Sequence, residues 1–476
     1  MERFKLATSG KTRTEHDLLG SREVPDEALF GIQTLRCIEN FDISRDYLSE
    51  YPEFTKALGI VKMAAVLANH ELGLINDTIK DAIVAACQEL IDGQHLEHFP
   101  IDMVQGGAGT SVNMNANEVI ANRALELMGK KRGEYKFCSP NDHVNMAQST
   151  NDAYPSAMHL GLYFTHFKVR EALQNIMESF AAKEEEFSHI IKMGRTQMQD
   201  AVPMTLGQSF GAYKFAIKHE LSRLEKAAKE LLFINMGATA IGTGITSEPG
   251  YAEACIKHIR IISGIDIRLA EDLVEATSDT SSMVFYASAL KMIAIRLSKI
   301  CNDLRILSSG PRAGLAEISL PPKQPGSSIM PGKVNPVIPE VVNQVCFKVI
   351  ANEMAVSLAS EAAQLELNVM EPVMVQSIVE SSDWLIRALD TLRLECIDGI
   401  KANESHCRHM VEHSIGIVTA LKPYIGYDKS TEIAKEALET GGSVYNLVME
   451  KGLLTREQLE TILDPKHMVK PVKVII

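Results

Sequence analysis

The stretch LGQSFGAYKFAIKHELSRLEKAAKEL, residues 206–231, decides the class of fold. Apolar side chains recur along it at intervals of three and four residues, at Leu206, Phe210, Tyr213, Ile217, Leu221, Leu224, Ala228 and Leu231. In an α-helix this spacing places the apolar residues on one face. The stretch is also much longer than the mean globular helix of about 11–12 residues. We therefore predict a long helix that packs against other helices.

Two further apolar stripes have the same period and predict partners for this helix. They comprise Tyr286, Leu290, Ile293, Leu297, Ile300, Leu304 and Leu307, and then Val342, Val345, Cys346, Val349 and Ile350. Such helices favour an extended bundle with shallow packing angles. Because an apolar stripe can be buried between chains as well as within one, we also expect an oligomer.

The remaining periodic segments predict shorter or interrupted helices. We expect helices over residues 53–72, 77–92 and 110–128. A further helix over residues 365–394 is expected to be interrupted at Pro372, since a proline inside a helix removes a hydrogen bond and causes a kink.

The change of helix length along the chain predicts three domains. A chain of 476 residues is long enough for two or three. We predict a mainly α protein with an N-terminal mixed, mostly helical domain over 1–147, a central long-helix bundle over 148–402 and a small C-terminal helical domain over 403–476.

Charge and composition exclude several classes of partner. The formal net charge is −13, whereas nucleic acids and anionic membranes favour basic surfaces. The eight cysteines are scattered without a Cys-x-x-Cys pair, which fits a reducing compartment. Residues 1–14 lack the apolar core of a signal peptide, and no apolar run is long enough to span a bilayer. We expect a cytoplasmic protein that binds neither nucleic acid nor membrane.

The loop GSSIMPGKVNP, residues 326–336, combines hydroxyl groups with a cation. Ser327 and Ser328 precede Lys333 and Asn335, and glycines would allow backbone N–H groups to converge on an anion. An ordinary connection between helices is the plainer interpretation of such a loop. A Walker-type phosphate loop does not fit, because five residues rather than four separate the glycines and valine follows the lysine.

Three other polar stretches favour a functional interpretation. They cover residues 107–115, 141–152 and 194–203, and we place each at the beginning or end of a helix. Their Ser, Thr, Asn and Gln side chains donate hydrogen bonds without adding negative charge, which suits a small carboxylate ligand. Helix capping is the competing explanation, although Ser149, Thr150 and Asn151 exceed what one helix end can use. His143 is a weaker candidate for a base than Ser327, because a lone loop histidine is more often structural.

These four stretches resemble the motifs of the fumarase/aspartase superfamily, and within it those of the aspartase branch. The resemblance runs from about His16 into the C-terminal domain, and it implies the three-domain superfamily fold. Three positions separate the branches: Ser111, Thr150 and Val337 resemble aspartases, where class II fumarases usually carry Gln, Ser and Thr. Gln197 stands where fumarases, and some aspartases, have His, and Ser139 stands where fumarases have a histidine that belongs to a second carboxylate site.

The resemblance implies a carbon–nitrogen lyase that eliminates ammonia from L-aspartate to give fumarate. Ser327 would be the base that removes the proton next to the side-chain carboxylate, giving an aci-carboxylate intermediate. Lys333 would bind the other carboxylate, with Asn335 orienting it. Further substrate-binding residues implied are Thr110, Ser149, Thr150, Asn151, Thr196, Gln197 and Ser328.

Cofactors and assembly are also implied by the resemblance. We expect no catalytic metal and no required cofactor, although activation by Mg²⁺ occurs in some aspartases. The active sites would be shared between subunits of a homotetramer. Two alternatives remain open: a class II fumarate hydratase that converts L-malate to fumarate, and a non-enzymatic structural protein like the lens crystallins.

Overall fold

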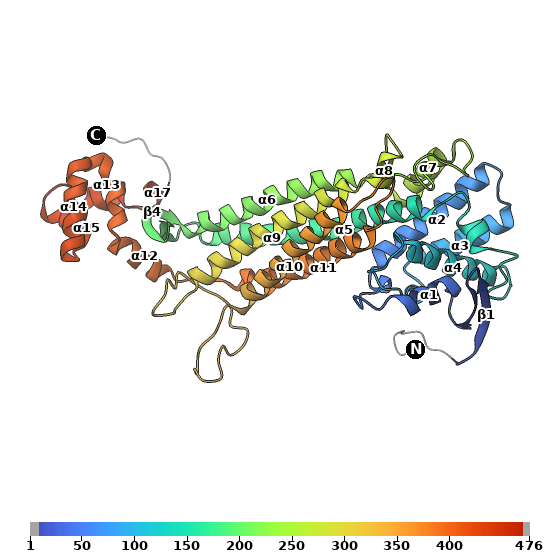
Figure 1. Cartoon of the computed structure of the whole chain (residues 1–476). Helices are drawn as coiled ribbons and strands as arrows, with labels where there is room; N and C mark the ends of the chain where they lie inside the picture. The colour runs from blue at the N-terminus through green and yellow to red at the C-terminus, as the bar shows by residue number, and fades with distance from the viewer. Residues whose placement is uncertain (1–8, 470–476) are drawn as a thin grey trace. The chain divides into compact units, whose positions relative to one another are not determined.

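A computed structural model describes residues 9–469 of the chain (Figure 1). Helices dominate, and the strands of this part of the chain form four two-stranded sheets. The prediction of a mainly α fold is confirmed. No helix among the described residues is long and apolar enough to cross a membrane.

The chain divides into two compact units. The first comprises Met1–Arg170, Ser222–Met292 and Lys348–Trp384, and the second comprises Glu171–Leu221, Ile293–Phe347 and Leu385–Ile476. The predicted division at residues 147 and 402 stays a prediction. Five long helices each contribute one section to each unit: α5 (Thr150–Glu186), α6 (Leu206–Glu230), α9 (Ser281–Leu307), α10 (Val337–Glu361) and α11 (Glu371–Glu395).

The first unit holds the shorter helices of the N-terminal half. Its other elements are β1 (Thr12–Asp17), β2 (Gly20–Pro25), α1 (Ile32–Asn40), η1 (Leu48–Glu50), α2 (Pro52–Glu71), α3 (Asp77–Ile91), η2 (Leu96–His98), α4 (Thr110–Leu127), η3 (Pro140–Val144), β5 (Phe233–Ile234), α7 (Tyr251–Ser263), β6 (Arg268–Leu269) and α8 (Glu275–Ser278). The helices predicted over 53–72, 77–92 and 110–128 are confirmed to within one residue at each end. Pro52 begins α2, where its missing N–H costs nothing, and Asn76 caps α3 by accepting from the Ile79 N–H at 3.1 Å.

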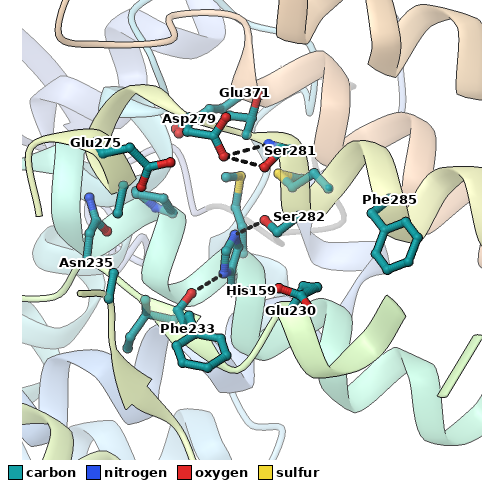
Figure 2. A pocket seen from close by; sticks show the side chains of 17 residues that line it. His159, Glu230, Phe233, Asn235, Glu275, Asp279, Ser281, Ser282, Phe285 and Glu371 are labelled. Atoms are coloured by element: carbon teal, nitrogen blue, oxygen red, sulfur yellow. Dashed lines mark hydrogen bonds between the residues drawn. The ribbon is translucent and has the colours of Figure 1, made fainter. Parts of the chain in front are cut away.

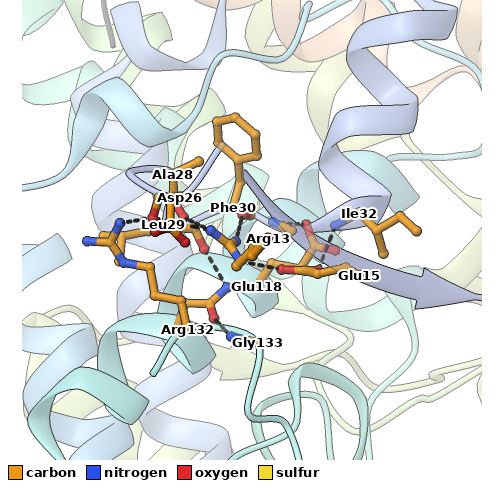
Figure 3. A network of polar contacts seen from close by, with 12 residues as sticks. Arg13, Glu15, Asp26, Ala28, Leu29, Phe30, Ile32, Glu118, Arg132 and Gly133 are labelled. Carbon is orange, nitrogen blue, oxygen red and sulfur yellow. Dashed lines mark hydrogen bonds and ion pairs between the residues drawn. The ribbon is translucent and has the colours of Figure 1, made fainter. Parts of the chain in front are cut away.

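Two buried carboxylates fix the start of α1 (Figure 3). Glu118 of α4 accepts hydrogen bonds from the backbone N–H groups of Gly31, Gln33 and Thr34 at 2.8–3.1 Å and from the Thr34 hydroxyl at 2.6 Å. Glu15 of β1 accepts from the Ile32 N–H at 2.9 Å. The unpaired N–H groups of a helix start are thereby satisfied in the interior. These bonds fasten β1 and α1 to α4, whose first residue is Thr110.

The long helices pack as the apolar stripes predict. Leu206, Phe210, Ile217, Leu224 and Leu231 are all fully buried, and α6 covers the predicted span. Side-chain hydrogen bonds also connect neighbouring helices. In the second unit the Tyr213 hydroxyl donates to Asp303 at 2.9 Å, and in the first unit the Asn352 amide donates to Ser381 at 3.0 Å.

The predicted interruption at Pro372 is wrong. Helix α11 begins at Glu371, so Pro372 is its second residue and residues 365–370 lie before the helix. In the first turn the proline takes the place of an N–H group that has no partner within the helix. The proline therefore begins the helix and does not kink it.

The second unit contains a β-hairpin where the sequence suggested only a loop at a helix end. β3 (Ile191–Thr196) and β4 (Gln199–Thr205) pair antiparallel across residues 194–203. Its other elements are β7 (Ile318–Ser319), η4 (Ile397–Gly399), β8 (Lys401–Ala402), α12 (Glu404–His413), η5 (Ile415–Ile417), α13 (Val418–Ile425), α14 (Tyr427–Thr440), α15 (Val444–Glu450), α16 (Arg456–Ile462) and α17 (Pro465–Met468). All eight cysteines are buried and free, as expected for small core residues.

Candidate active site

Gly109, the residue just before α4, occupies a position that only glycine fits. Gly109 has a φ of +85°, and a Cβ atom there would lie 2.4 Å from the ring of Tyr154. This close approach sets the first turn of α4 against α5. Thr110, the first residue of α4, is exposed and donates its hydroxyl to the Gly107 carbonyl at 2.7 Å.

The start of α5 presents the next three predicted site residues. The Ser149 hydroxyl accepts from the Asn151 N–H at 3.2 Å, so Ser149 caps the helix. The Asn151 amide nitrogen donates to the Ala240 carbonyl at 2.7 Å, and the Asn235 amide donates to the Asn151 carbonyl at 3.0 Å. These bonds fix Asn151 in place and engage one of its amide N–H groups, whereas its amide oxygen remains an acceptor.

A buried ammonium group lies beneath Thr150. Lys62 of α2 is wholly buried, and its Nζ donates to the amide oxygens of Asn113 at 2.6 Å, Gln148 at 2.8 Å and Asn145 at 3.1 Å. Asn113 in turn donates from Nδ2 to the Thr150 hydroxyl oxygen at 3.1 Å. Because that oxygen accepts from Asn113, the Thr150 hydroxyl proton is available to a ligand. Burial lowers the pKa of Lys62 to about 7.

A buried carboxylate holds the same region from the other side. Asp152 accepts from the backbone N–H groups of Ser149 at 2.9 Å, Thr239 at 2.9 Å and Gly237 at 3.1 Å. Burial raises the pKa of Asp152 to about 6, and the three N–H groups oppose that rise. The carboxylate thereby joins the segment around residue 238 to the beginning of α5.

The hairpin of the second unit carries Thr196 and Gln197 at its exposed tip. Gln197 and Met198 form the turn, with φ angles of +54° and +62°. Behind the tip, the wholly buried Glu317 pairs with Arg195 and, at 2.9 Å, with Lys192. A buried carboxylate held by two cations is an anchor for the hairpin, because removing any partner would leave an uncompensated charge.

The loop 326–336 is closed at its base and open at its tip. The Gly326 N–H donates to the Lys333 carbonyl at 2.7 Å, and the Asn335 amide donates to the Gly326 carbonyl at 2.9 Å. Ser327 is half-buried, and its hydroxyl accepts from the Ile329 N–H at 3.2 Å. Ser328 and Lys333 are exposed, and Lys333 makes no ion pair with any residue between 9 and 469. Asn335 thus closes the base of the loop, and its part in substrate binding stays a prediction.

The ten predicted site residues fall into three groups. Thr110, Ser149, Thr150 and Asn151 lie in the first unit, around the beginnings of α4 and α5. Thr196 and Gln197 lie on the hairpin, and the remaining four lie on the loop, both within the second unit. Each group is a set of hydrogen-bond donors on a local scaffold, but which of them contact a substrate stays a prediction.

Two residues that the sequence did not single out support the first group. Lys62 could have been noticed as the one charged residue in the otherwise apolar run 57–68 of α2. Asp152 stands inside a polar stretch that the sequence did identify, but its role depends on backbone groups of residues 237–239.

The described part of the chain offers one convergent set of metal-ligand types. His95, Glu97 and His98 bring their ligand atoms within 4.8 Å of one another, and the His98 carbonyl accepts from the Asn115 amide at 2.9 Å. His95 also contacts Glu89 at 2.7 Å, and Glu89 pairs with Arg123. The expected lack of a catalytic metal stays a prediction.

Comparison with known proteins identifies the family. Residues 20–351 match the family described as lyase, and residues 417–470 match the fumarase C C-terminus family. The chain belongs to the fumarase/aspartase superfamily of lyases. Within this superfamily the aspartate ammonia-lyase of Pseudomonas aeruginosa is 56% identical to this chain over 467 residues, which are 98% of each protein.

Solved structures of the superfamily share the fold. The crystal structure of fumarate lyase:delta crystallin from Brucella melitensis bound to cobalt is 51% identical, with a TM-score of 0.94 over 97% of this chain and 100% of that chain. The class II fumarase from Schistosoma mansoni is 33% identical, with a TM-score of 0.89 over 96% of this chain and 99% of that chain. The greater identity to aspartate ammonia-lyases agrees with the branch indicated by Ser111, Thr150 and Val337.

Proposed function

We infer that this protein is an aspartate ammonia-lyase, which reversibly eliminates ammonia from L-aspartate to give fumarate. One observation carries this conclusion: aspartate ammonia-lyases of several bacteria are 52–56% identical to the chain over 96–98% of its length. The class II fumarase comparison at 33% identity is much weaker. The enzyme is thus a carbon–nitrogen lyase acting on a small dicarboxylate.

The chemistry demands a dense set of donors around one carboxylate. Removing the proton next to the side-chain carboxylate puts a second negative charge on it, so the intermediate needs preorganised N–H and O–H groups. The Lys62–Asn113–Thr150 chain supports this role, since it directs a hydroxyl proton outward over a buried positive charge. We assign Thr110, Ser149 and Thr150, with Thr196, Gln197 and Ser328, to carboxylate binding. Asn151 is assigned to the amino group or a carboxylate.

The base is proposed to be Ser327. A serine hydroxyl is a weak acid, so its alkoxide requires nearby N–H groups and positive charge. The contact with the Ile329 N–H supports this assignment, as does the presence in the same closed loop of Lys333, which has no ion pair within residues 9–469. Lys333 is proposed to bind the second carboxylate. Loop 326–336 would then act as a lid over the substrate.

The active enzyme is proposed to be a homotetramer whose subunits share each active site. Support comes from large apolar side chains left exposed on the long helices. On α10 these are Phe347, Met354 and Leu358, which are 58–61% exposed, and α6 and α9 add Phe215 and Ile295 at 49% and 42%. A helix with apolar residues on more than one face is best satisfied by burial against other chains.

Domain organisation, compartment and cofactor use complete the proposal. We propose three domains, over 1–147, 148–402 and 403–476, in a cytoplasmic enzyme. Turnover is proposed to need no cofactor, with Mg²⁺ serving only as an activator. Enzyme treated with EDTA is then expected to retain turnover, and addition of Mg²⁺ is expected to raise its rate.

Ultraviolet absorbance of fumarate tests the activity directly. Purified protein is given L-aspartate in one cuvette and L-malate in another. Fumarate from L-aspartate alone is expected. Fumarate from L-malate alone would make the protein a hydratase, and no fumarate from either substrate by a folded protein would favour a structural role like that of the crystallins.

A further inference from the structure

The first unit contains a cavity that none of the ten predicted site residues lines. Its volume is about 450 Å³, within the range of small-molecule sites (Figure 2). It lies between the α5 turn at Pro155, Met158 and His159, the strand β5, the helix α8, the first turn of α9 and the beginning of α11.

Glu371 is the unusual residue of this cavity. It is only 3% exposed, yet its carboxyl group has no hydrogen bond or ion pair with any residue of the described chain. Buried ionisable groups in folded proteins are almost always paired, since an unpaired buried charge is strongly unfavourable. A carboxyl group that lines a cavity without a partner therefore indicates a group missing from the cavity.

The cavity wall favours a positive charge on that group. Glu230, Glu275 and Asp279 line it together with Glu371, and no lysine or arginine does. His159 does not oppose a cation: its Nδ1–H donates to the Phe233 carbonyl at 2.9 Å, and its Nε2 accepts from the Ser282 hydroxyl at 3.2 Å. Both contacts suit the neutral imidazole, and burial lowers the pKa of His159.

The same wall favours an organic cation over a bare metal ion. The carboxylates of the cavity do not belong to the one convergent set of metal-ligand types among the described residues, which is His95, Glu97 and His98. Apolar surface lies between them, contributed by Met158, Ile234 and Phe285 among others. An alkyl chain can bury itself against this surface while its ammonium group meets a carboxylate.

We propose that this cavity binds a linear aliphatic amine, whose ammonium group pairs with the carboxylate of Glu371. None of the ten predicted site residues lines this cavity, although Asn235 of its wall donates to the Asn151 carbonyl at 3.0 Å. The exposed acids at the cavity rim, Glu230, Glu275 and Asp279, draw the cation in through their combined negative potential.

Protonation provides a specific signature of this pairing. Burial raises the pKa of Glu371 well above its ordinary value, with no partner to oppose the rise. An ammonium group pairs with the ionised carboxylate, so amine binding should lower this pKa and release protons wherever the carboxyl group is partly protonated. The titratable groups that face it are His159, Glu230, Glu275 and Asp279, and Tyr154 lies close by.

Isothermal titration calorimetry on the full-length protein tests the proposal, with n-butylammonium chloride as the probe and n-butanol as its neutral counterpart. We expect binding of the amine only, with net proton release shown by comparing buffers of different ionisation enthalpy. Glu371→Gln should weaken binding at least tenfold. Glu366→Gln, an exposed acid in the same connection, should bind as the wild type does.

Three results would overturn the proposal. The first is equal binding of butylamine and butanol, and the second is undiminished amine binding by a folded Glu371→Gln variant. The third is no binding to the wild type together with altered assembly of Glu371→Gln. That result would mean that Glu371 pairs with a basic side chain of a second copy of the chain. Should Glu371→Gln not fold, the pH dependence of wild-type binding decides, since an amine affinity that does not rise with pH contradicts pairing with a titrating carboxyl group.

Discussion

The ammonium nitrogen of Lys62 lies 2.6 Å from the amide oxygen of Asn113, and both side chains are shielded from solvent. The Asn113 amide nitrogen in turn donates a hydrogen bond to the hydroxyl oxygen of Thr150, at the beginning of α5. Below the Lys62 pKa of about 7, a positive charge is thus held beneath a donor that is proposed to bind the reacting carboxylate. In a low-dielectric interior, such a charge acts on the site more strongly than it would in water.

Replacing Lys62 with Met is expected to impair catalysis. The change removes the charge and leaves the amide oxygens of Asn113, Asn145 and Gln148 without their shared donor. Hydrogen bonds to charged groups contribute about 1.5–3 kcal/mol, which corresponds to about a 10- to 150-fold loss of kcat/KM for L-aspartate. Steady-state kinetics of fumarate formation measures this loss.

Lys56→Met is the matched control for Lys62. Lys56 lies on the same helix, and its Nζ sits over the ring of Phe164 at 4.9 Å, away from the amide cluster. We expect this variant to keep kcat/KM within about twofold of the wild type, as surface changes usually do. Equal kinetics for the two lysine variants would show that the buried charge has no part in the reaction.

The raised pKa of Asp152 predicts how kcat/KM for L-aspartate changes at acidic pH. Its pKa is raised to about 6, so its carboxylate is ionised above this pH and accepts from Ser149, Gly237 and Thr239. Below it the carboxyl group gains a proton and becomes a poorer acceptor for three N–H groups. We therefore expect kcat/KM to fall as the pH drops through about 6.

The Asp152→Asn variant tests whether Asp152 is the group whose protonation lowers the activity. Its amide cannot accept from all three N–H groups, so activity should be low at every pH and the decline near pH 6 should disappear. The measurement is kcat/KM for L-aspartate across the acidic and neutral range. If the variant kept wild-type activity with an unchanged decline, the titrating group would be another residue.

The periodic parts of the fold were predictable because a helix is a local structure. The stripe from Leu206 to Leu231 and the span of α4 require only residues three or four positions apart. The hairpin of β3 and β4 was missed for an equally local reason. Its turn at Gln197 and Met198 has positive φ angles on residues that seldom adopt them, without the usual Asn-Gly signal.

The site was predictable only in part, because its support comes from distant segments. The hydroxyls and amides of the four polar stretches can be recognised from the sequence, because these stretches are rich in Ser, Thr, Asn and Gln. Lys62 does not, since its three acceptors come from α4 and from the turn before α5, and only folding brings them together. The role of Glu317 likewise depends on Lys192 and Arg195, more than a hundred positions away.

Two glycines of loop 326–336 are expected to differ in importance. A Cβ atom at Gly326 would lie 2.7 Å from the Lys333 carbonyl oxygen and 3.0 Å from the Asn335 nitrogen. Gly326→Ala must therefore open the base of the loop and displace Ser327. Misplacement of a catalytic group by about 1 Å can cost about 10²-fold in rate, so we expect kcat to fall by about 10- to 100-fold.

Gly332→Ala is the control for this steric effect. Gly332 has a φ of +84°, but a Cβ atom there would meet nothing within 4 Å. The change introduces backbone strain of about 1 kcal/mol at the loop tip, and kcat should fall by less than tenfold. If the two variants ranked in the reverse order in kcat, the closed base would not be what positions Ser327.

The strongest test of the proposed mechanism is Ser327→Ala. The Ser327 hydroxyl accepts from the Ile329 N–H at 3.2 Å in a half-exposed loop, so its removal leaves no buried polar group unpaired. Folding and thermal unfolding should match the wild type. If Ser327 is the base, kcat for L-aspartate should fall by about 10³-fold or more. Ser328→Ala, which removes only a proposed binding hydroxyl, should lose far less and mainly in KM. Near-wild-type elimination by Ser327→Ala would rule out this serine, and the base would then have to be sought among other groups of the loop and the hairpin.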